Sequence, residues 1–149
     1  MGNQDHYRKL ETMYQAAPCN KQYDSKLTVE EGTAEVVIPV EKFDFHAGGT
    51  VHGATYFKSL DNAAYFAASS LETNVFLLTA YFNVHFIRSI DSGKIQSIGQ
   101  VVDTTQSRTV AEAVAYDADE RKIAYGTGSF VYSSIELSAD LGYKKSCRS

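Results

Sequence analysis

A single carboxylate, Asp61, lies in a run of apolar and small residues that begins at His52. It follows Gly53, a glycine that can open a helix, by eight positions. A buried carboxylate costs free energy unless a partner compensates for it, so an acid in this setting needs a reason. Catalysis as a general base or a nucleophile is one reason. A solvent-facing position near Lys58 is the other, and the residues alone leave both open.

The start of the same helix offers a second chemical group. A helix N-terminus carries unpaired backbone N–H groups and a partial positive charge, which suit a developing oxyanion. Gly53 leaves the approach to them free of a side chain. Eight helical residues span about 12 Å, whereas reacting atoms must lie about 3–3.5 Å apart. We therefore expect a site that combines Gly53 of one chain with Asp61 of a second.

The residues around these groups predict the elements that position them. Apolar residues at helical spacing predict an amphipathic helix over residues 4–17, ended by Pro18. Residues 33–40 have the β-rich pattern of a first strand. A loop with paired glycines follows at 43–50, and Thr50 is a plausible N-cap for a helix that runs to about Leu71. An apolar and alanine-rich stripe on this helix indicates packing against a sheet.

The rest of the chain predicts four strands, at about residues 75–88, 94–104, 107–116 and 122–132, joined by short turns. Gly126 and Gly128 lie inside the last of them, and strand glycines often mark a close approach of another backbone, here interpreted as the helix. The tail over 138–149 is polar and is expected to fray. The predicted fold class is α+β: a long central helix wrapped by an antiparallel sheet of about five strands, plus a short N-terminal helix, in one domain over 1–149.

Composition limits the classes of function. The chain has 149 residues, is 44% hydrophobic and carries a net charge of −4, so it resembles one globular domain rather than a nucleic-acid binder. The N-terminus has no apolar signal core, and no stretch is long enough to span a membrane. Cys19 and Cys147 show no metal-ligand spacing, and two free thiols are favoured over a disulfide between them. A cytoplasmic location is expected.

Two segments resemble a known family. Residues 46–54, with Asp61 after them, resemble the pattern Asn-x-x-Gly-x-x-His-Gly-Gly followed by an Asp or Glu in hotdog-fold acyl-CoA thioesterases. Residues 79–88 resemble the second strand of that family. The most similar branch includes the phenylacetate-pathway and 4-hydroxybenzoyl-CoA enzymes, and the resemblance covers about residues 33–132. It implies an acyl-CoA substrate, no separate cofactor, and a homodimer or dimer of dimers whose sites combine two chains.

The resemblance also assigns roles to residues. It implies Asp61 as base or nucleophile and the Gly53 N-terminus as the group that polarises the thioester carbonyl. Thr79 matches a hydroxyl residue that helps to place water. Tyr65 falls where some relatives have a polar contact to the nucleophile. His52 is counted with the substrate-binding residues and is interpreted as a residue that holds the loop before the helix, with a proton shuttle as the alternative role.

Two positions depart from the family pattern. His46 stands where relatives carry Asn or Gln, which adds a titratable group that either contacts the carbonyl or packs the loop. Ala54 replaces the usual second glycine and narrows the approach to the helix. Arg88 and Arg108 are candidates to hold the phosphates of coenzyme A, or are ordinary surface charges.

Two other functions remain open on the sequence. A hotdog hydratase or dehydratase would pair a loop histidine with a helix carboxylate, which His46 and Asp61 superficially resemble, although the proline-rich loop typical of acyl-carrier-protein dehydratases is absent from the sequence. A non-catalytic acyl-CoA-binding domain is the third possibility, although binding alone does not need a carboxylate at position 61. No metal site is expected, because the four histidines do not combine with carboxylates at a ligand spacing.

Overall fold

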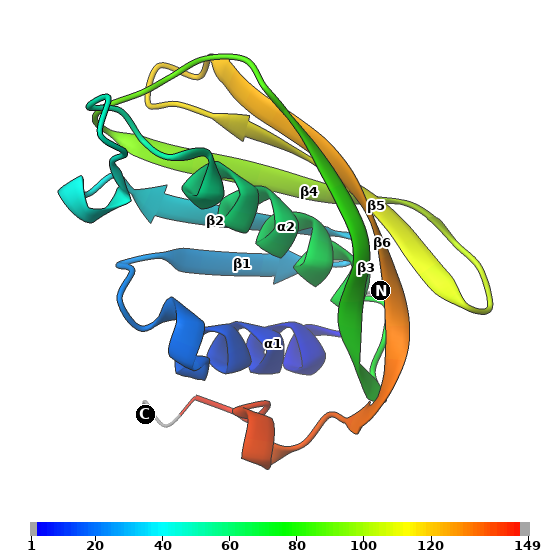
Figure 1. The fold of residues 1–149 in the computed structure, drawn as a ribbon. Coiled ribbons are helices and arrows are strands. Elements are labelled where there is room, and N and C mark those ends of the chain that lie inside the picture. The colour runs from blue at the N-terminus through cyan, green and yellow to red at the C-terminus, as the bar shows by residue number, and fades with distance from the viewer. Residues whose placement is uncertain (1–2, 147–149) are drawn as a thin grey trace.

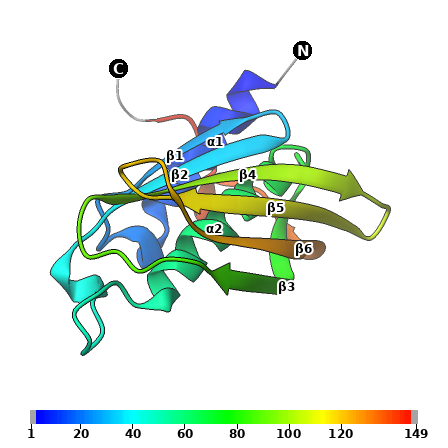
Figure 2. The same ribbon diagram turned by 90° about the horizontal axis from the view of Figure 1, so that it is seen from above.

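The computed structural model describes residues 3–146 and consists of one curved antiparallel sheet with two helices on its concave side (Figure 1). The helices are α1 (Gln4–Ala16) and α2 (Gly53–Ser69). The strands are β1 (Lys26–Glu30), β2 (Thr33–Pro39), β3 (Val75–Phe86), β4 (Lys94–Thr104), β5 (Arg108–Tyr116) and β6 (Lys122–Glu136). Their order across the sheet is β1-β2-β4-β5-β6-β3, as the view from above shows (Figure 2). This is the long helix held by an antiparallel sheet that the sequence predicts.

Small side chains let α2 lie close to the sheet. The inner side of the helix is made of fully buried alanines at helical spacing: Ala63, Ala64, Ala67 and Ala68. A row of small residues crosses four neighbouring strands opposite one another: Ala34, Gly99, Ala113 and Gly126. At Gly99 a Cβ atom would collide with the backbone carbonyl of Ala63. The position of α2 is thus fixed by backbone approach as well as by apolar burial.

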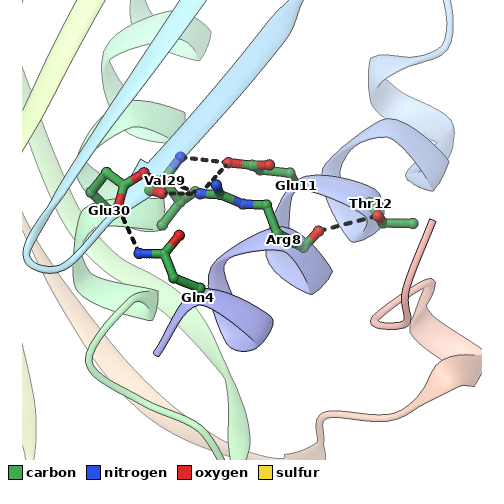
Figure 3. A network of polar contacts seen from close by, with 6 residues as sticks. All are labelled: Gln4, Arg8, Glu11, Thr12, Val29 and Glu30. Carbon is green, nitrogen blue, oxygen red and sulfur yellow. Dashed lines mark hydrogen bonds and ion pairs between the residues drawn. The ribbon is translucent and has the colours of Figure 1, made fainter. Parts of the chain in front are cut away.

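Helix α1 covers one edge of the sheet. Val29 of β1 has its backbone N–H bound by Glu11 Oε2 at 2.8 Å and its carbonyl bound by Arg8 Nη2 at 2.5 Å (Figure 3). Arg8 also pairs with Glu11 at 3.0 Å, which holds the two side chains together. Side chains of α1 therefore take the place of a neighbouring strand, one of the ways in which edge strands are protected.

Strand β3 forms the opposite edge. Half-way along it, the side chains that face α2 change from odd-numbered to even-numbered residues. Its pairing with β6 shifts between Thr79 and Tyr81, so that Ala80 is an extra residue in a β-bulge. Before the bulge, Leu77 and Thr79 face α2. After it, Phe82 and Phe86 do so, packing against the rings of Phe57 and Tyr56. Within residues 3–146 no other element pairs with the free edge of β3.

Several details differ from the sequence predictions. The sheet has six strands rather than about five. The additional strand is β1, which the sequence did not predict because it is short and has only two inward apolar residues. The helix α2 is capped by His52 rather than Thr50. Gly126 and Gly128 make room for Phe82 and the backbone of β3, whereas Gly99 is the glycine that meets the helix.

The C-terminal segment also differs from the expected frayed tail. It forms a short helical turn at Ala139–Leu141, and the Tyr143 hydroxyl lies 2.6 Å from Nδ1 of the buried His6. His6 Nε2 donates to the Ser69 carbonyl at 2.8 Å, so one imidazole joins α1, the end of α2 and the tail. Cys147 lies outside the described residues, while Cys19 is an exposed free thiol. No helix within the described range is both long and apolar enough to cross a membrane.

We expect Gly99→Ala to destabilise the fold by about 1–3 kcal/mol, because the added methyl group forces α2 away from β4. Urea unfolding followed by circular dichroism measures the effect. Gln100→Ala, at the next and exposed position of the same strand, is the control and should stay within about 0.5 kcal/mol of wild type. Equal stability of the two variants would contradict the close packing of α2 on β4.

Candidate active site

The N-terminus of α2 is held by its own loop and leaves one backbone donor free. His52 caps the helix, with Nδ1 accepting the Ala54 N–H at 2.8 Å. The Thr55 N–H donates to the His52 carbonyl at 3.0 Å. Within the described part of the chain, the Gly53 N–H has no hydrogen-bond acceptor. This N–H is therefore available to a ligand oxygen, at the positive end of the helix.

The buried Asp44 holds the start of α2 in place through hydrogen bonds. Its Oδ1 accepts the Thr55 hydroxyl at 3.1 Å and its Oδ2 accepts the Glu41 N–H at 3.0 Å. Its carbonyl accepts the His52 N–H at 2.8 Å. Sequence reasoning did not single out Asp44. The signal was its place between Phe43 and Phe45, where an acid is unexpected unless it is hydrogen-bonded.

His46 is exposed and both of its ring nitrogens are engaged inside the loop. Nδ1 accepts the Gly48 N–H at 3.0 Å, so the neutral ring carries its proton on Nε2, which lies 3.0 Å from the Thr50 hydroxyl. The rings of His46 and His52 meet edge to face at 6.2 Å. Within one protomer, His46 thus stabilises the conformation of the loop that precedes α2.

A cleft of about 430 Å³ opens beside Gly53. Phe86 forms its wall, since a Cβ atom on Gly53 would lie 3.0 Å from Phe86 Cζ. The exposed Arg88 also lines this cleft and is oriented by its contact to the Lys122 carbonyl at 2.6 Å. The exposed Ala54 lies next to Gly53 on the first turn of the helix. Gly53, with its free N–H, and Arg88 therefore line the same cleft.

Asp61 lies in a different pocket, two turns further along α2. The Thr79 hydroxyl donates to its Oδ1 at 3.1 Å. Burial raises the pKa of the Asp61 carboxyl above its ordinary value, and the bond from Thr79 and the charge of Lys58 oppose this only in part. A carboxylate with a raised pKa is a better proton acceptor near neutral pH than an ordinary aspartate.

The structure brings some of the predicted site residues together and separates others. Asp61, Thr79 and Tyr65 line one pocket, and Gly53 and Arg88 line the other, with no lining residue in common. The Tyr65 hydroxyl donates to the Leu77 carbonyl at 2.7 Å rather than to Asp61. Arg108 contacts Ser129 and lies on the outer face of β5, opposite the alanines that pack on α2. Arg108 therefore does not join either pocket of its own protomer.

Asn62 is the site residue that sequence reasoning missed. It lines the Asp61 pocket, and its buried Nδ2 makes no hydrogen bond of normal geometry, although the amide lies close enough to the Tyr14 hydroxyl to oppose in part the rise in the Tyr14 pKa caused by burial. The signal was its position between Asp61 and the alanine stripe, on the inner half of an apolar helix. Among residues 3–146 no three His, Cys, Asp or Glu side chains lie close enough to hold a metal ion.

Comparisons with known proteins identify the family. Residues 48–124, which run from the loop before α2 into β6, match the model of the thioesterase superfamily. The chain belongs to the thioesterase superfamily. Its fold is the hotdog fold. The matched region contains Gly53, Asp61, Thr79 and Arg88, whereas α1 precedes it.

Solved structures of other proteins have the same fold. The Escherichia coli PaaI protein from the phenylacetic acid degradation operon superposes with a TM-score of 0.83, over 93% of this chain and 100% of its own, at 16% identity. A thioesterase family protein from Silicibacter pomeroyi gives a TM-score of 0.76, over 85% of this chain and 96% of its own, at 26% identity. Among curated protein sequences none matches the chain.

We expect His52→Ala to lower the free energy of unfolding by about 0.5–2 kcal/mol, because it removes the acceptor that caps α2. His52→Asn keeps a capping oxygen and should remain close to wild type. Chemical unfolding of the three proteins measures the difference. A loss of equal size in both variants would show that the imidazole acts by packing rather than as a cap.

We expect Asp61→Asn to stabilise the folded chain at neutral pH. The Asp61 carboxyl binds its proton more tightly in the folded than in the unfolded chain, because burial raises its folded pKa. Wild type therefore loses stability, relative to the variant, as the pH rises through the interval between the unfolded and the folded pKa. Thermal unfolding of both proteins from pH 3 to 8 measures this. A difference that instead shrinks as the pH rises would contradict the raised pKa.

Proposed function

We propose that the protein is an acyl-CoA thioesterase in which Asp61 is the general base or nucleophile. The observation that carries the proposal is a half-buried carboxylate with a raised pKa, hydrogen-bonded to Thr79 at an apolar pocket, in a chain of the thioesterase superfamily. As a base, Asp61 takes a proton from water while the water oxygen bonds to the thioester carbon. The C–S bond then breaks, and the sulfur of coenzyme A leaves and takes a proton.

The carbonyl oxygen would be held by the Gly53 N–H of a second protomer. Within one protomer the free N–H and Asp61 lie in separate pockets, about 12 Å apart along α2. The open edge of β3 and its neighbouring residues expose large apolar side chains, among them Leu78, Tyr81, Phe86 and Ile87. A homodimer through this edge would cover them and bring each Gly53 toward the other chain's Asp61. A dimer of two such dimers is the larger assembly consistent with this site.

Arg88 is the better candidate for the phosphates of coenzyme A. It stands at the opening of the cleft that holds Gly53, so the thioester and the charged part of one substrate would meet the same protomer. Arg108 reaches a substrate only from the outer face of the sheet or from another copy of the chain. No separate cofactor is needed for this reaction.

The two alternative functions have less support. A hydratase or dehydratase would need a ring nitrogen of His46 free to move a proton, but both contact groups of the same loop. A purely binding domain would gain nothing from an aspartate whose burial disfavours its charged form. Hydrolysis uses both the free N–H and the raised pKa.

We expect wild type to release thiol from a panel of acyl-CoAs, and Asp61→Asn to reduce kcat by about 10²- to 10⁴-fold. A thiol-reactive dye follows the reaction, and circular dichroism confirms that the variant is folded. Absence of thiol release from every acyl-CoA would disprove the proposed function. Equal rates in both proteins would leave a thioesterase but remove Asp61 from its mechanism.

Mixing two inactive variants tests the shared site within the same assay. Asp61→Asn and Gly53→Val, unfolded together and refolded as a mixture, form mixed dimers in which one site has both intact residues. If each site combines two chains, activity should return to about one quarter of wild type. Activity that stays at the level of the separate variants would place both groups in one protomer.

A further inference from the structure

The ammonium group of Lys58 is held near Asp61 by an aromatic ring. Lys58 precedes Asp61 by three residues on α2, so the two side chains leave the helix as neighbours, about 5–6 Å apart at Cβ. Lys58 Nζ lies over the Tyr23 ring, 5.4 Å from its centroid, which is the geometry of a cation–π contact. Lys58 is half-buried, so this contact is partly shielded from water.

Two other parts of the chain fix the Tyr23 ring. Tyr23 lies in the turn before β1, and Phe43, from the loop before α2, packs edge to face on its ring at 5.5 Å. Tyr23 is also partly buried against the hydrophobic core. The ring therefore has a fixed place beside α2, and so does the lysine that lies over it.

This placement keeps Lys58 out of an ion pair with Asp61. Among the ion pairs of residues 3–146 none joins these two side chains, although their spacing on the helix allows one. Burial raises the pKa of the Asp61 carboxyl, and the hydrogen bond from Thr79 and the charge of Lys58 lower it in part. The positive charge thus acts on Asp61 without contact with its carboxylate oxygens.

The other groups around Asp61 do not supply such a charge. The side of α1 contributes the Tyr14 phenol and the Cys19 thiol, α2 contributes the Tyr65 phenol, and β3 contributes only neutral side chains. Burial raises the pKa of both tyrosines, which keeps them neutral near pH 7. In the described part of the chain, Asp61 is the one acid in this lining, and the opposite charge comes from Lys58 outside it.

We infer that Lys58 is a positioning residue that acts through Asp61: its ammonium, held over the Tyr23 ring, keeps the carboxyl ionised without pairing with it. The inference rests on the proposed function, in which Asp61 is a base or nucleophile, and both roles require the ionised form. A direct ion pair would also ionise Asp61. It would, however, weaken the carboxylate as a base and occupy an oxygen that must meet water or the thioester.

The test uses the opposite effects of removing the ammonium and removing the ring. Lys58→Met deletes the charge, so the Asp61 carboxyl should titrate at a pH about 0.5–1 higher than in wild type. Tyr23→Leu lets the ammonium reach the carboxylate, so the same carboxyl should titrate at a lower pH than in wild type. Carbon-13 NMR of aspartate-labelled protein measures both titrations, and Asp61→Asn identifies the Asp61 signal.

Conservative variants separate the charge effect from damage to the fold. Lys58→Arg keeps a cation over the ring and Tyr23→Phe keeps the ring, so both should titrate within about 0.3 of the wild-type pH. Lys26→Met removes a lysine from the exposed side of β1 and should also match wild type. Lys58→Gln and Tyr23→Met replace variants that do not fold. An unchanged titration after loss of the ammonium or of the ring, or a shift in the same direction after both, would overturn the inference.

Thiol release from acyl-CoAs links the titration to catalysis. The acid limb of kcat/KM should move to higher pH in Lys58→Met and to lower pH in Tyr23→Leu. The plateau of Tyr23→Leu should fall about 3- to 10-fold, because a paired carboxylate is a weaker base. Acid limbs that stay in place while the titrations move would overturn the role of Lys58 in the reaction. If the carboxyl titrates as expected but no acyl-CoA is hydrolysed, the proposed function fails and the effect of Lys58 on Asp61 stands.

Discussion

The close approach of α2 to the sheet is the constraint on which the rest of the structure depends. The buried alanines of the helix lie over a row of small residues that crosses four strands, and at Gly99 only a glycine fits against the Ala63 carbonyl. Tight packing of this kind leaves the helix no freedom to slide or rotate. The first backbone N–H of α2 and the Asp61 carboxylate are therefore both held in place by the packing of the helix on the sheet.

The same helix also keeps these two parts separate. Gly53 opens toward Phe86 and Arg88 at one end of β3, and Asp61 faces Thr79 near the other. Within a protomer, α1 protects the β1 edge with Arg8 and Glu11, whereas no element of residues 3–146 pairs with the β3 edge. The two edges of the sheet thus differ: one is covered by α1, and the other lies beside the cleft that contains Gly53.

The sequence predicted the parts of this structure that depend on local pattern. The periodicity around Asp61 located α2, and the order of strands after it was correct, because these segments are long and strongly patterned. It did not predict β1, whose short pattern is weak, or the capping role of His52, which needs a loop conformation set by Asp44. The burial of the Asn62 amide nitrogen could not be inferred either, because it depends on three-dimensional surroundings, in this case α1 and β3, which are distant from residue 62 in the chain.

The bulge at Ala80 has a consequence for how this chain can change over evolutionary time. One extra residue sets which side chains of β3 face the helix, with Leu77 and Thr79 inward before it and Phe82 and Phe86 inward after it. Without the bulge, the same residues would place the second half of the strand the other way round, with both aromatic rings on the opposite face. Removal of Ala80 itself would leave a regular strand with the same residues inward, whereas a deletion between Phe82 and Phe86 would turn Phe86 outward. The bulge is therefore the position in β3 where a change of length costs least.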